Sequence, residues 1–178
     1  LGESAGTQTF ASVDEADVAI VMGANPTDAH PVFASRLKRR LRAGAKLIVI
    51  DPRKIELVSS PHISAEFHLP VRPGTNVTVL NALAHVILSE GLHAQDYIQE
   101  RSDLGAFRKW QKFILAEQHS PETTADITGI PANDLRRAAR LYAGAGNAAI
   151  FYGLGVTEHS QGSTAVMAIA NLAMLTGN

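Results

Sequence analysis

ADVAIVMG at residues 16–23 and KLIVIDP at residues 46–52 are the two stretches that decide the fold of this chain. Both are short runs rich in Val and Ile. An Asn-Pro pair follows the first run, and an Asp-Pro pair ends the second. Continuous apolar runs of this length are typical of strands that are buried on both faces of a parallel sheet. We therefore predict a buried strand at each of them.

The segment between these two strands carries a helical pattern. Phe33, Leu37 and Leu41 recur every fourth residue among five basic residues, and Gly44 follows them. This spacing predicts an amphipathic helix with a solvated basic face that ends near Gly44. A strand, a helix and a strand in this order predict a right-handed crossover and a parallel pair.

The remainder of the chain continues the alternation of strands and helices. Further strands are expected at residues 66–71 and 148–153, and helices at 77–88, 96–114, 121–128, 131–143 and 160–175. The last helix is nearly uncharged, which predicts that it is buried. Tyr97, Phe107, Trp110 and Phe113 are expected to anchor the 96–114 region by packing. The pattern predicts one domain over residues 1–178, of the α/β class, with a doubly wound, mostly parallel sheet flanked by helices in a Rossmann-like arrangement.

The composition argues against several classes of function. A formal net charge of −1 provides no basic field for nucleic acid and no charge pattern for a membrane surface. There are no cysteines, so this segment holds neither a disulfide nor a cysteine-ligated iron–sulfur cluster, and the histidines show no spacing typical of a metal site. The sequence contains neither an apolar run long enough for a membrane-spanning helix nor a visible targeting peptide. We expect a cytoplasmic location, with a periplasmic parent as the alternative.

Loops after three of the predicted strands are the candidate ligand sites. In doubly wound folds ligands lie outside the carboxyl ends of the strands, where the following helices direct their amide-rich N-termini. Small and hydrogen-bonding residues gather in MGANPTDAHP at 22–31, DPRK at 51–54 and YGLGVTEHSQG at 152–162, with PGTN at 73–76 as a turn with capping chemistry before another helix. His30 and His159 lie in these loops, where a histidine either contacts a ligand or satisfies a backbone group. We expect the three strand ends to converge on one cleft. No complete GxGxxG motif is present at the first turn, so ordinary nicotinamide binding is not favoured.

Each conspicuous residue in these loops admits two interpretations. Asp51 is placed either to accept hydrogen bonds from ribose hydroxyls or a guanine edge, or to cap its own turn. Arg53 would stack on a purine or pair with phosphate, or else lie on the surface. Gly23, Gly153 and Gly155 would allow close backbone approach to a ligand, or serve plain turns.

At these same loops the sequence resembles the molybdopterin oxidoreductase family, and within it the catalytic subunits of formate dehydrogenases. The resemblance rests on five motifs in family order: MGANPTDAHPVF, IVIDPRK, LPVRPGTNVTVLNALAHVI, ITGIPANDLRRAARLYA and YGLGVTEHSQGSTAVMAIANLAMLTGN. It covers essentially the whole chain. In that family this region is an α/β domain that holds one guanine dinucleotide arm of a bis-pterin cofactor, so the resemblance implies the same fold and ligand here.

The resemblance implies a cofactor-binding set drawn from four loops. The first two loops would line the nucleotide and recognise its guanine or ribose, and the other two would approach the same end of the cofactor. The set is Gly23, Asn25, Asp28, Asp51, Arg53, Gly74, Thr75, Asn76, Gly153, Leu154, Gly155, Glu158 and Gln161. Two positions depart from common family patterns: Asn76 stands where many relatives outside the formate dehydrogenases carry Asp, and Glu158 where some carry a neutral amide.

For a full-length parent, the resemblance implies a bis-molybdopterin guanine dinucleotide carrying molybdenum or tungsten, with iron–sulfur clusters only outside this segment. The family's metal-binding cysteine or selenocysteine would lie upstream and its active-site arginine downstream, so no catalytic and no metal-binding residue is assigned here. The parent would oxidise formate to carbon dioxide, with the remaining domains of the same large subunit and electron-transfer subunits as partners. Two alternatives stay open: the equivalent domain of another family member such as a nitrate reductase, and a noncatalytic α/β binding module.

Overall fold

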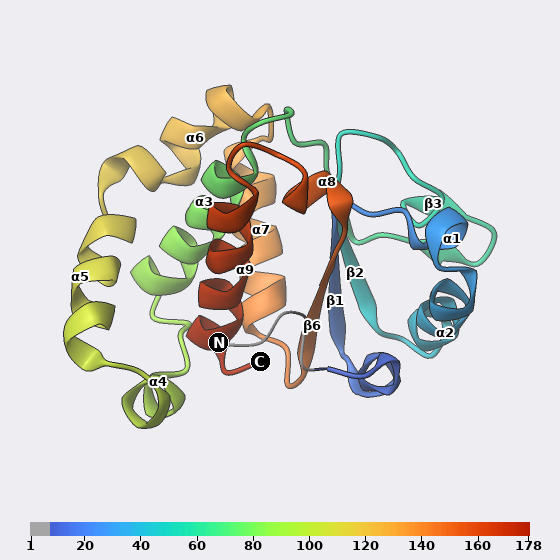
Figure 1. Cartoon of the computed structure of the whole chain (residues 1–178), viewed down its shortest axis with the longest axis horizontal. Coiled ribbons are helices and arrows are strands. Elements are labelled where there is room, and N and C mark those ends of the chain that lie inside the picture. The colour runs from blue at the N-terminus through green and yellow to red at the C-terminus, as the bar shows by residue number, and fades with distance from the viewer. Residues whose placement is uncertain (1–7) are drawn as a thin grey trace.

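A computed structural model describes residues 8–178, which fold around a central four-stranded sheet (Figure 1). The strands are β1 Val18–Met22, β2 Lys46–Ile50, β5 Phe67–Leu69 and β6 Ala148–Tyr152, in the spatial order β5-β2-β1-β6. All three neighbouring pairs are parallel. Each of the four predicted strands is therefore confirmed, and so is the parallel sheet.

The order of the strands reverses at β1. Strands β2 and β5 lie on one side of β1, and β6 lies on the other. Met22 pairs with both Ile50 and Tyr152, so β1, β2 and β6 end level with one another. In doubly wound sheets such a switch point opens a crevice at the carboxyl edge. The three candidate loops therefore leave the sheet side by side.

Helices cover both faces of the sheet. Figure 1 shows α1 and α2 on one side and α3, α7 and α9 on the other. The helical segments are η1 Phe10–Glu15, α1 Pro26–Ala29, α2 Pro31–Arg42, α3 Asn76–Ser89, α4 Gln95–Arg101, α5 Leu104–Ile114, η2 Glu117–His119, α6 Pro121–Thr128, α7 Ala132–Ala143, α8 Leu154–Thr157 and α9 Gly162–Thr176. A two-stranded antiparallel ribbon, β3 Ser59–Ser60 with β4 Ile63–Ser64, lies in the connection from β2 to β5. Within residues 8–178, no helix combines the length and hydrophobicity needed to cross a membrane.

Alternate residues of β1 enter two separate cores. Ile20 and Met22 pack in the layer of α3, α7 and α9, whereas Ala19 and Val21 pack with Leu37 of α2. All five residues are at most 1% exposed. Helices on both faces of the parallel sheet exclude water from every position of β1, which explains its uninterrupted apolar run.

The prediction that the last helix is buried is wrong for one of its sides. Ala165, Ile169 and Leu172 form a buried stripe along α9, but Met167 on the opposite side is 59% exposed. The low charge of this helix led to the prediction, yet only the side that faces the sheet and α3 finds a partner in the described residues. The loop predicted at residues 22–31 also differs from the structure, because it contains the one-turn helix α1.

Two of the four predicted aromatic anchors are wrong. Phe107 and Trp110 are partly buried against the main core, as predicted. Tyr97 and Phe113 are instead 36% and 50% exposed. Helices α4 and α5 form the outer layer, so only one side of each faces protein, and Phe113 stacks beside His119 with ring centroids 4.4 Å apart.

Glu90 joins α3 to α7 through an ion pair. Its carboxylate accepts two hydrogen bonds from the Arg140 guanidinium, at 2.7 and 2.9 Å, and lies 3.6 Å from the guanidinium of Arg136. The hydrogen bonds from Arg140, with the positive charges of both arginines, hold the pKa of Glu90 below its ordinary value.

Replacing Glu90 with Gln is expected to lower the free energy of unfolding at neutral pH by about 0.2–1 kcal/mol, the range of partly exposed ion pairs. Because the folded-state pKa is depressed, this stabilisation is present above the unfolded-state pKa and is lost as the pH falls through the folded-state pKa. Urea unfolding at neutral and acidic pH measures the difference. Glu100→Gln is the control, since the Glu100 side chain is 71% exposed beside Arg101. A deficit of E90Q that persists unchanged in acid would contradict the assignment.

Candidate functional site

Backbone hydrogen bonds tie the candidate loops together at the carboxyl edge of the sheet. The Gly23 N–H donates to the Ile50 carbonyl at 3.0 Å. The N–H groups of Gly153 and Gly155 donate to the carbonyls of Met22 and Gly23, at 3.2 and 3.0 Å. These bonds continue the strand pairing beyond the last strand residues. The three strand ends therefore lie together at one edge of the sheet, and their convergence on one cleft stays a prediction.

Gly23 and Gly155 pack directly against each other. A Cβ atom on Gly155 would lie 2.7 Å from the Gly23 carbonyl oxygen, and one on Gly23 would lie 2.7 Å from the Gly155 carbonyl carbon. Gly23 also has a φ of 55°, in the left-handed region that side chains disfavour. The crossing of two loops thus gives an internal reason for glycine at both positions, independent of any ligand. Gly153 sits beside the same crossing, where a Cβ atom would lie 3.0 Å from the Gly23 carbonyl oxygen.

Gly155→Ala is expected to destabilise the chain by about 1–3 kcal/mol, because the added methyl group meets backbone that has no free space to move into. Thermal or urea unfolding measures the effect. Gly105→Ala is the control, because Gly105 lies in the exposed helix α5, where alanine is the better helix former. Equal stability of G155A and the unchanged chain would show that the crossing is not tightly packed.

The loop between β1 and α1 contains polar atoms without protein partners. The Asn25 side-chain amide donates to an Asp28 carboxylate oxygen at 2.6 Å. The Asn25 Oδ1 and Thr27 Oγ1 atoms are buried, and neither has a hydrogen-bond partner within the described chain. Buried polar atoms are almost always satisfied, and leaving one unpaired costs about 1–3 kcal/mol. These two atoms belong to residues three and five positions after Met22, the last residue of β1, and they therefore indicate a place for a hydrogen-bonding ligand.

Asp51 is buried at the end of β2 and caps its own turn. Its Oδ1 accepts a hydrogen bond from the Arg53 N–H at 2.8 Å, and its backbone carbonyl lies 3.0 Å from His68 Nε2. The side chain is 4% exposed. The turn-capping interpretation is therefore present in the structure. It occupies only Oδ1, and Oδ2 makes none of the hydrogen bonds found in the described residues.

Arg53 extends away from this turn into solvent. Its side chain is 74% exposed, and its Nε lies 3.6 Å from Asp51 Oδ1. The guanidinium plane is thus free to stack on a ring or to meet a phosphate group at the mouth of the site. Leu154 and Glu158 are also exposed, on either end of α8, so the last strand presents them to the outside of the loop cluster.

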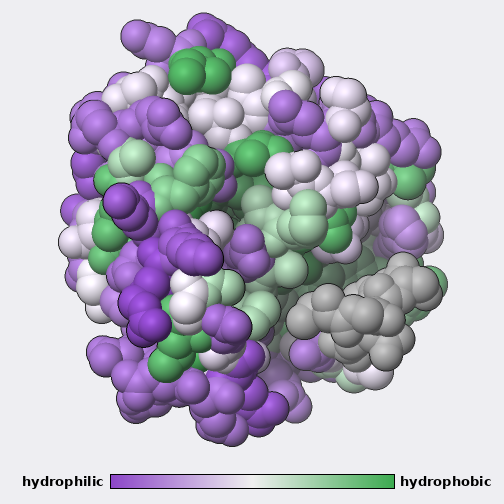
Figure 2. All heavy atoms as spheres, turned by 60° about the vertical axis from the view of Figure 1, so that its left-hand side comes forward, coloured by the Kyte–Doolittle hydropathy of each residue, from purple (hydrophilic) through white to green (hydrophobic). Residues whose placement is uncertain are grey.

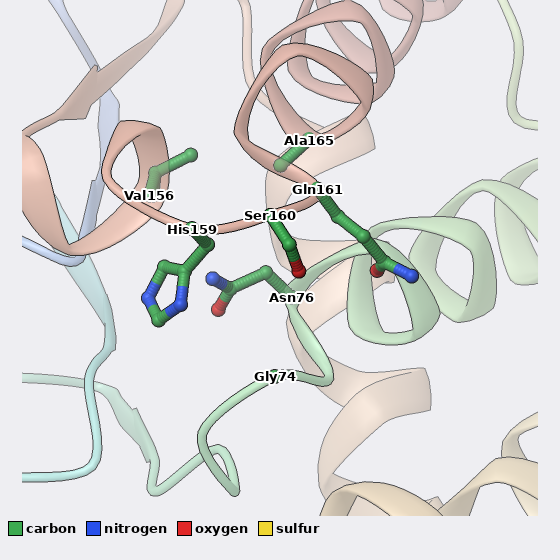
Figure 3. Close-up of a pocket in the computed structure, with 7 residues that line it drawn as sticks. All are labelled: Gly74, Asn76, Val156, His159, Ser160, Gln161 and Ala165. Carbon is green, nitrogen blue, oxygen red and sulfur yellow. The ribbon is translucent and has the colours of Figure 1, made fainter.

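A pocket of about 110 Å³ lies between the start of α3 and the loop that joins α8 to α9 (Figure 3). Gly74, Asn76 and Gln161 from the predicted set line it. His159 also lines it, whereas Val156, Ser160 and Ala165 were not among the predicted site residues. Figure 3 shows the Asn76 amide between the His159 ring and the Ser160 hydroxyl. This amide donates to the Gly155 carbonyl at 3.4 Å. Ser160 lies within the candidate loop at residues 152–162, so the sequence indicated its loop but not the direction of its side chain.

Both helices that begin at this pocket have uncapped N-termini. The N-cap residues are Thr75 for α3 and Gln161 for α9, and neither side chain accepts a hydrogen bond from its helix. The predicted capping at the start of α3 is wrong, because the Thr75 hydroxyl donates to the Arg72 carbonyl at 2.8 Å. Neither helix has an acidic residue in its first turn. The free N–H groups and the positive ends of two helix dipoles therefore meet at one pocket, an arrangement that attracts anionic groups.

The chain matches a known protein family along almost its whole length. The family model described as molybdopterin oxidoreductase matches residues 2–178. The chain belongs to the molybdopterin oxidoreductase family. Formate dehydrogenase H of Escherichia coli is 40% identical over 178 residues, which is 100% of this chain and 24% of that protein. A nitrate reductase of Symbiobacterium thermophilum is 34% identical over 172 residues, 93% of this chain and 22% of that protein.

This molybdopterin oxidoreductase segment spans about a quarter of the length of these relatives. Its fold is also found in the solved structure of acetylene hydratase from Pelobacter acetylenicus, with a TM-score of 0.81 over 94% of this chain and 24% of that one. At 24% identity, that likeness concerns the fold alone. It confirms the predicted α/β class with a parallel sheet flanked by helices.

Proposed function

We propose that this chain binds the guanine-nucleotide end of a molybdopterin guanine dinucleotide, as one domain of a larger catalytic subunit. The observation that carries the proposal is the meeting of two uncapped helix N-termini, those of α3 and α9, at one pocket beside the switch point of the sheet. A dinucleotide carries negatively charged phosphate groups, and free backbone N–H groups at helix starts are suited to bind them.

The residues present fit a nucleotide on three counts. The unpaired oxygens of Asn25 and Thr27 offer acceptors in the loop after β1, and the Thr27 hydroxyl is also a donor. Asp51 Oδ2 offers a further acceptor at the end of β2, and the exposed Arg53 guanidinium offers a plane for stacking. Asn76 and Gln161 bring neutral amides to the pocket, where they do not repel an anion.

Gly23, Gly153 and Gly155 would contribute backbone rather than side chains, with Asp28, Gly74, Thr75, Leu154 and Glu158 completing the proposed set. Glu158 is exposed and does not line the pocket. In this arrangement the chain binds and orients the nucleotide and excludes water from its buried edge.

When bound, the pterin and its metal would supply two-electron redox chemistry. We propose that the full-length parent carries two such pterin nucleotides on molybdenum or tungsten, with iron–sulfur clusters outside this segment, and that it oxidises formate in the cytoplasm and passes electrons to partner subunits. The similarity to formate dehydrogenase H supports formate as substrate. The similarity to a nitrate reductase supports the second candidate, nitrate reduction by a parent with the same domain.

The chain is expected to bind GDP weakly, in the high-micromolar to millimolar range, because the pterin contacts belong to other parts of the parent. A dissociation constant of about 1 mM corresponds to roughly −4 kcal/mol, which a few hydrogen bonds and one stacking contact can supply. GDP should bind more tightly than ADP, since adenine lacks the N1–H and the 2-amino group of guanine, from which the Asp51 carboxylate would accept hydrogen bonds.

Titration of GDP and ADP by calorimetry or ligand-detected NMR measures this preference. Asp51→Ala is expected to abolish it. Asp51→Asn is a sharper variant, because its Oδ1 can still accept the Arg53 N–H and keep the turn while the carboxylate is lost. Asp96→Ala, on the exposed surface of α4, is the control. Equal affinity of the unchanged chain for GDP and ADP would refute guanine recognition by Asp51.

The chain alone is expected to show no formate oxidation with any dye acceptor. The sequence contains no cysteine, and the described residues contain no group of His, Asp and Glu side chains arranged to hold a metal ion. Formate-dependent dye reduction should be absent from the purified chain and present in the full-length subunit. Turnover that follows the chain through every purification step would contradict this prediction.

A further inference from the structure

One face of α9 is uncharged and lacks a partner within the described residues. Ser163, Thr164, Met167 and Asn171 are exposed on it, and Ala170 and Met174 are half-buried. We call these six residues the α9 open face. The sequence from residue 159 to residue 178 contains no Asp, Glu, Lys or Arg. A helix face intended for solvent normally carries charged residues, as α2 does.

Strand β6 forms an equally unprotected edge of the sheet. It is five residues long, AAIFY, and each of them is partly or largely exposed, whereas every residue of β1 is buried. The opposite edge is β5, which is three residues long and mostly buried. Within residues 8–178, no strand pairs with the outer side of β6. Edge strands that face solvent are usually short or protected by charged residues, and β6 is neither.

The α9 open face and the β6 edge lie close together. The Ala148 N–H at the start of β6 donates to the Asn178 side-chain carbonyl just beyond α9, at 2.7 Å. Helix α8, which follows β6, packs against α9 and exposes 67% of Leu154. Figure 2 brings forward the left-hand side of Figure 1 and shows apolar residues gathered across the middle of that view, where the surface is hollowed.

We infer that the α9 open face and the β6 edge form the interface with a neighbouring domain of the same large subunit, which would present an uncharged, apolar surface to them. The inference rests on the proposed function in taking the chain as one domain of a larger subunit. Relatives that match the whole chain are about four times as long, so most of their structure is available to cover such a surface. The cores of protein interfaces are depleted of charged residues, and this surface has none.

Methionine oxidation distinguishes the covered from the uncovered state. The chain has three methionines in three environments: Met22 is fully buried, Met174 is half-buried and Met167 is 59% exposed. In the isolated chain, dilute peroxide should oxidise Met167 first and Met22 last. In the full-length subunit, Met167 oxidation should slow by on the order of tenfold, since interface cores exclude water as protein interiors do. Equal Met167 rates in both would overturn the inference.

A charged substitution provides a second test. Met167→Glu should leave the isolated chain folded, because the side chain points to solvent. In the full-length subunit it should increase cleavage by a protease between domains. Val32→Glu is the matched control on α2, where Val32 is 84% exposed. Wild-type protease resistance of M167E would overturn the inference.

Two further outcomes are informative. If Met167 becomes protected in the isolated chain as its concentration rises, and sedimentation shows a dimer, a second copy covers the surface and the proposed occupant is wrong. The sequence of the full-length polypeptide tests the premise of a larger subunit separately. Failure of the guanine titration would leave the Met167 comparison unaffected, because Met167 lies outside the pocket.

Discussion

The crossing of the loop after β1 and the loop after β6 is the contact on which the site depends. The Gly155 N–H donates to the Gly23 carbonyl, and neither residue has a side chain to keep the two backbones apart. Helix α8 begins one residue before Gly155, and α9 follows it, so the crossing fixes where α9 starts. The Asn76 amide reaches the same Gly155 carbonyl and ties α3 to this point. The Gly23–Gly155 contact and the Asn76 hydrogen bond together hold the starts of α9 and α3 beside each other.

Three buried side-chain atoms of the described residues lack hydrogen-bond partners: Asn25 Oδ1 and Thr27 Oγ1 in the loop after β1, and His93 Nδ1 between α3 and α4. Asp103 and Ser120 cap α5 and α6 by accepting backbone N–H groups at 2.8 and 3.2 Å. Helices α3 and α9 have no such caps, and the buried oxygens of Asn25 and Thr27 lack partners in the described chain. Side-chain caps are also missing from α2, α4 and α7, so what distinguishes α3 and α9 is that both of their N-termini lie at one pocket.

The helices on the two faces of the sheet differ in the charge that they present. On the α2 side, Arg36 and Arg40 pair with Asp14 and Asp17 near the start of β1, and the hydrogen bond from Arg36 lowers the pKa of Asp14. That layer covers the sheet and presents charge to water. On the other side, α3 and α7 are joined by the Glu90 ion pair, but α9 at the margin carries no charge. The contrast arises because charge is favourable where water remains and unfavourable where a second apolar surface excludes it.

Sequence determined the elements and the fold class of this chain, because both depend on local patterns. Runs such as VAIVM and LIVI are apolar at every position only when helices cover both faces, and proline at the first turn marks where α6 begins. The candidate loops followed from the strand ends. The tertiary structure alone decided that Asp51 caps its own turn, that Thr75 turns away from its helix, and that Gly23 meets Gly155. The Gly23–Gly155 contact joins residues far apart in the chain. The hydrogen bonds of Asp51 and Thr75 are local, but these side chains have more than one possible partner, and no periodicity distinguishes between them. The exposure of Met167 was likewise decided by the tertiary structure. An uncharged helix is buried only where another part of the fold packs against it, and the sequence of the helix does not show where that happens.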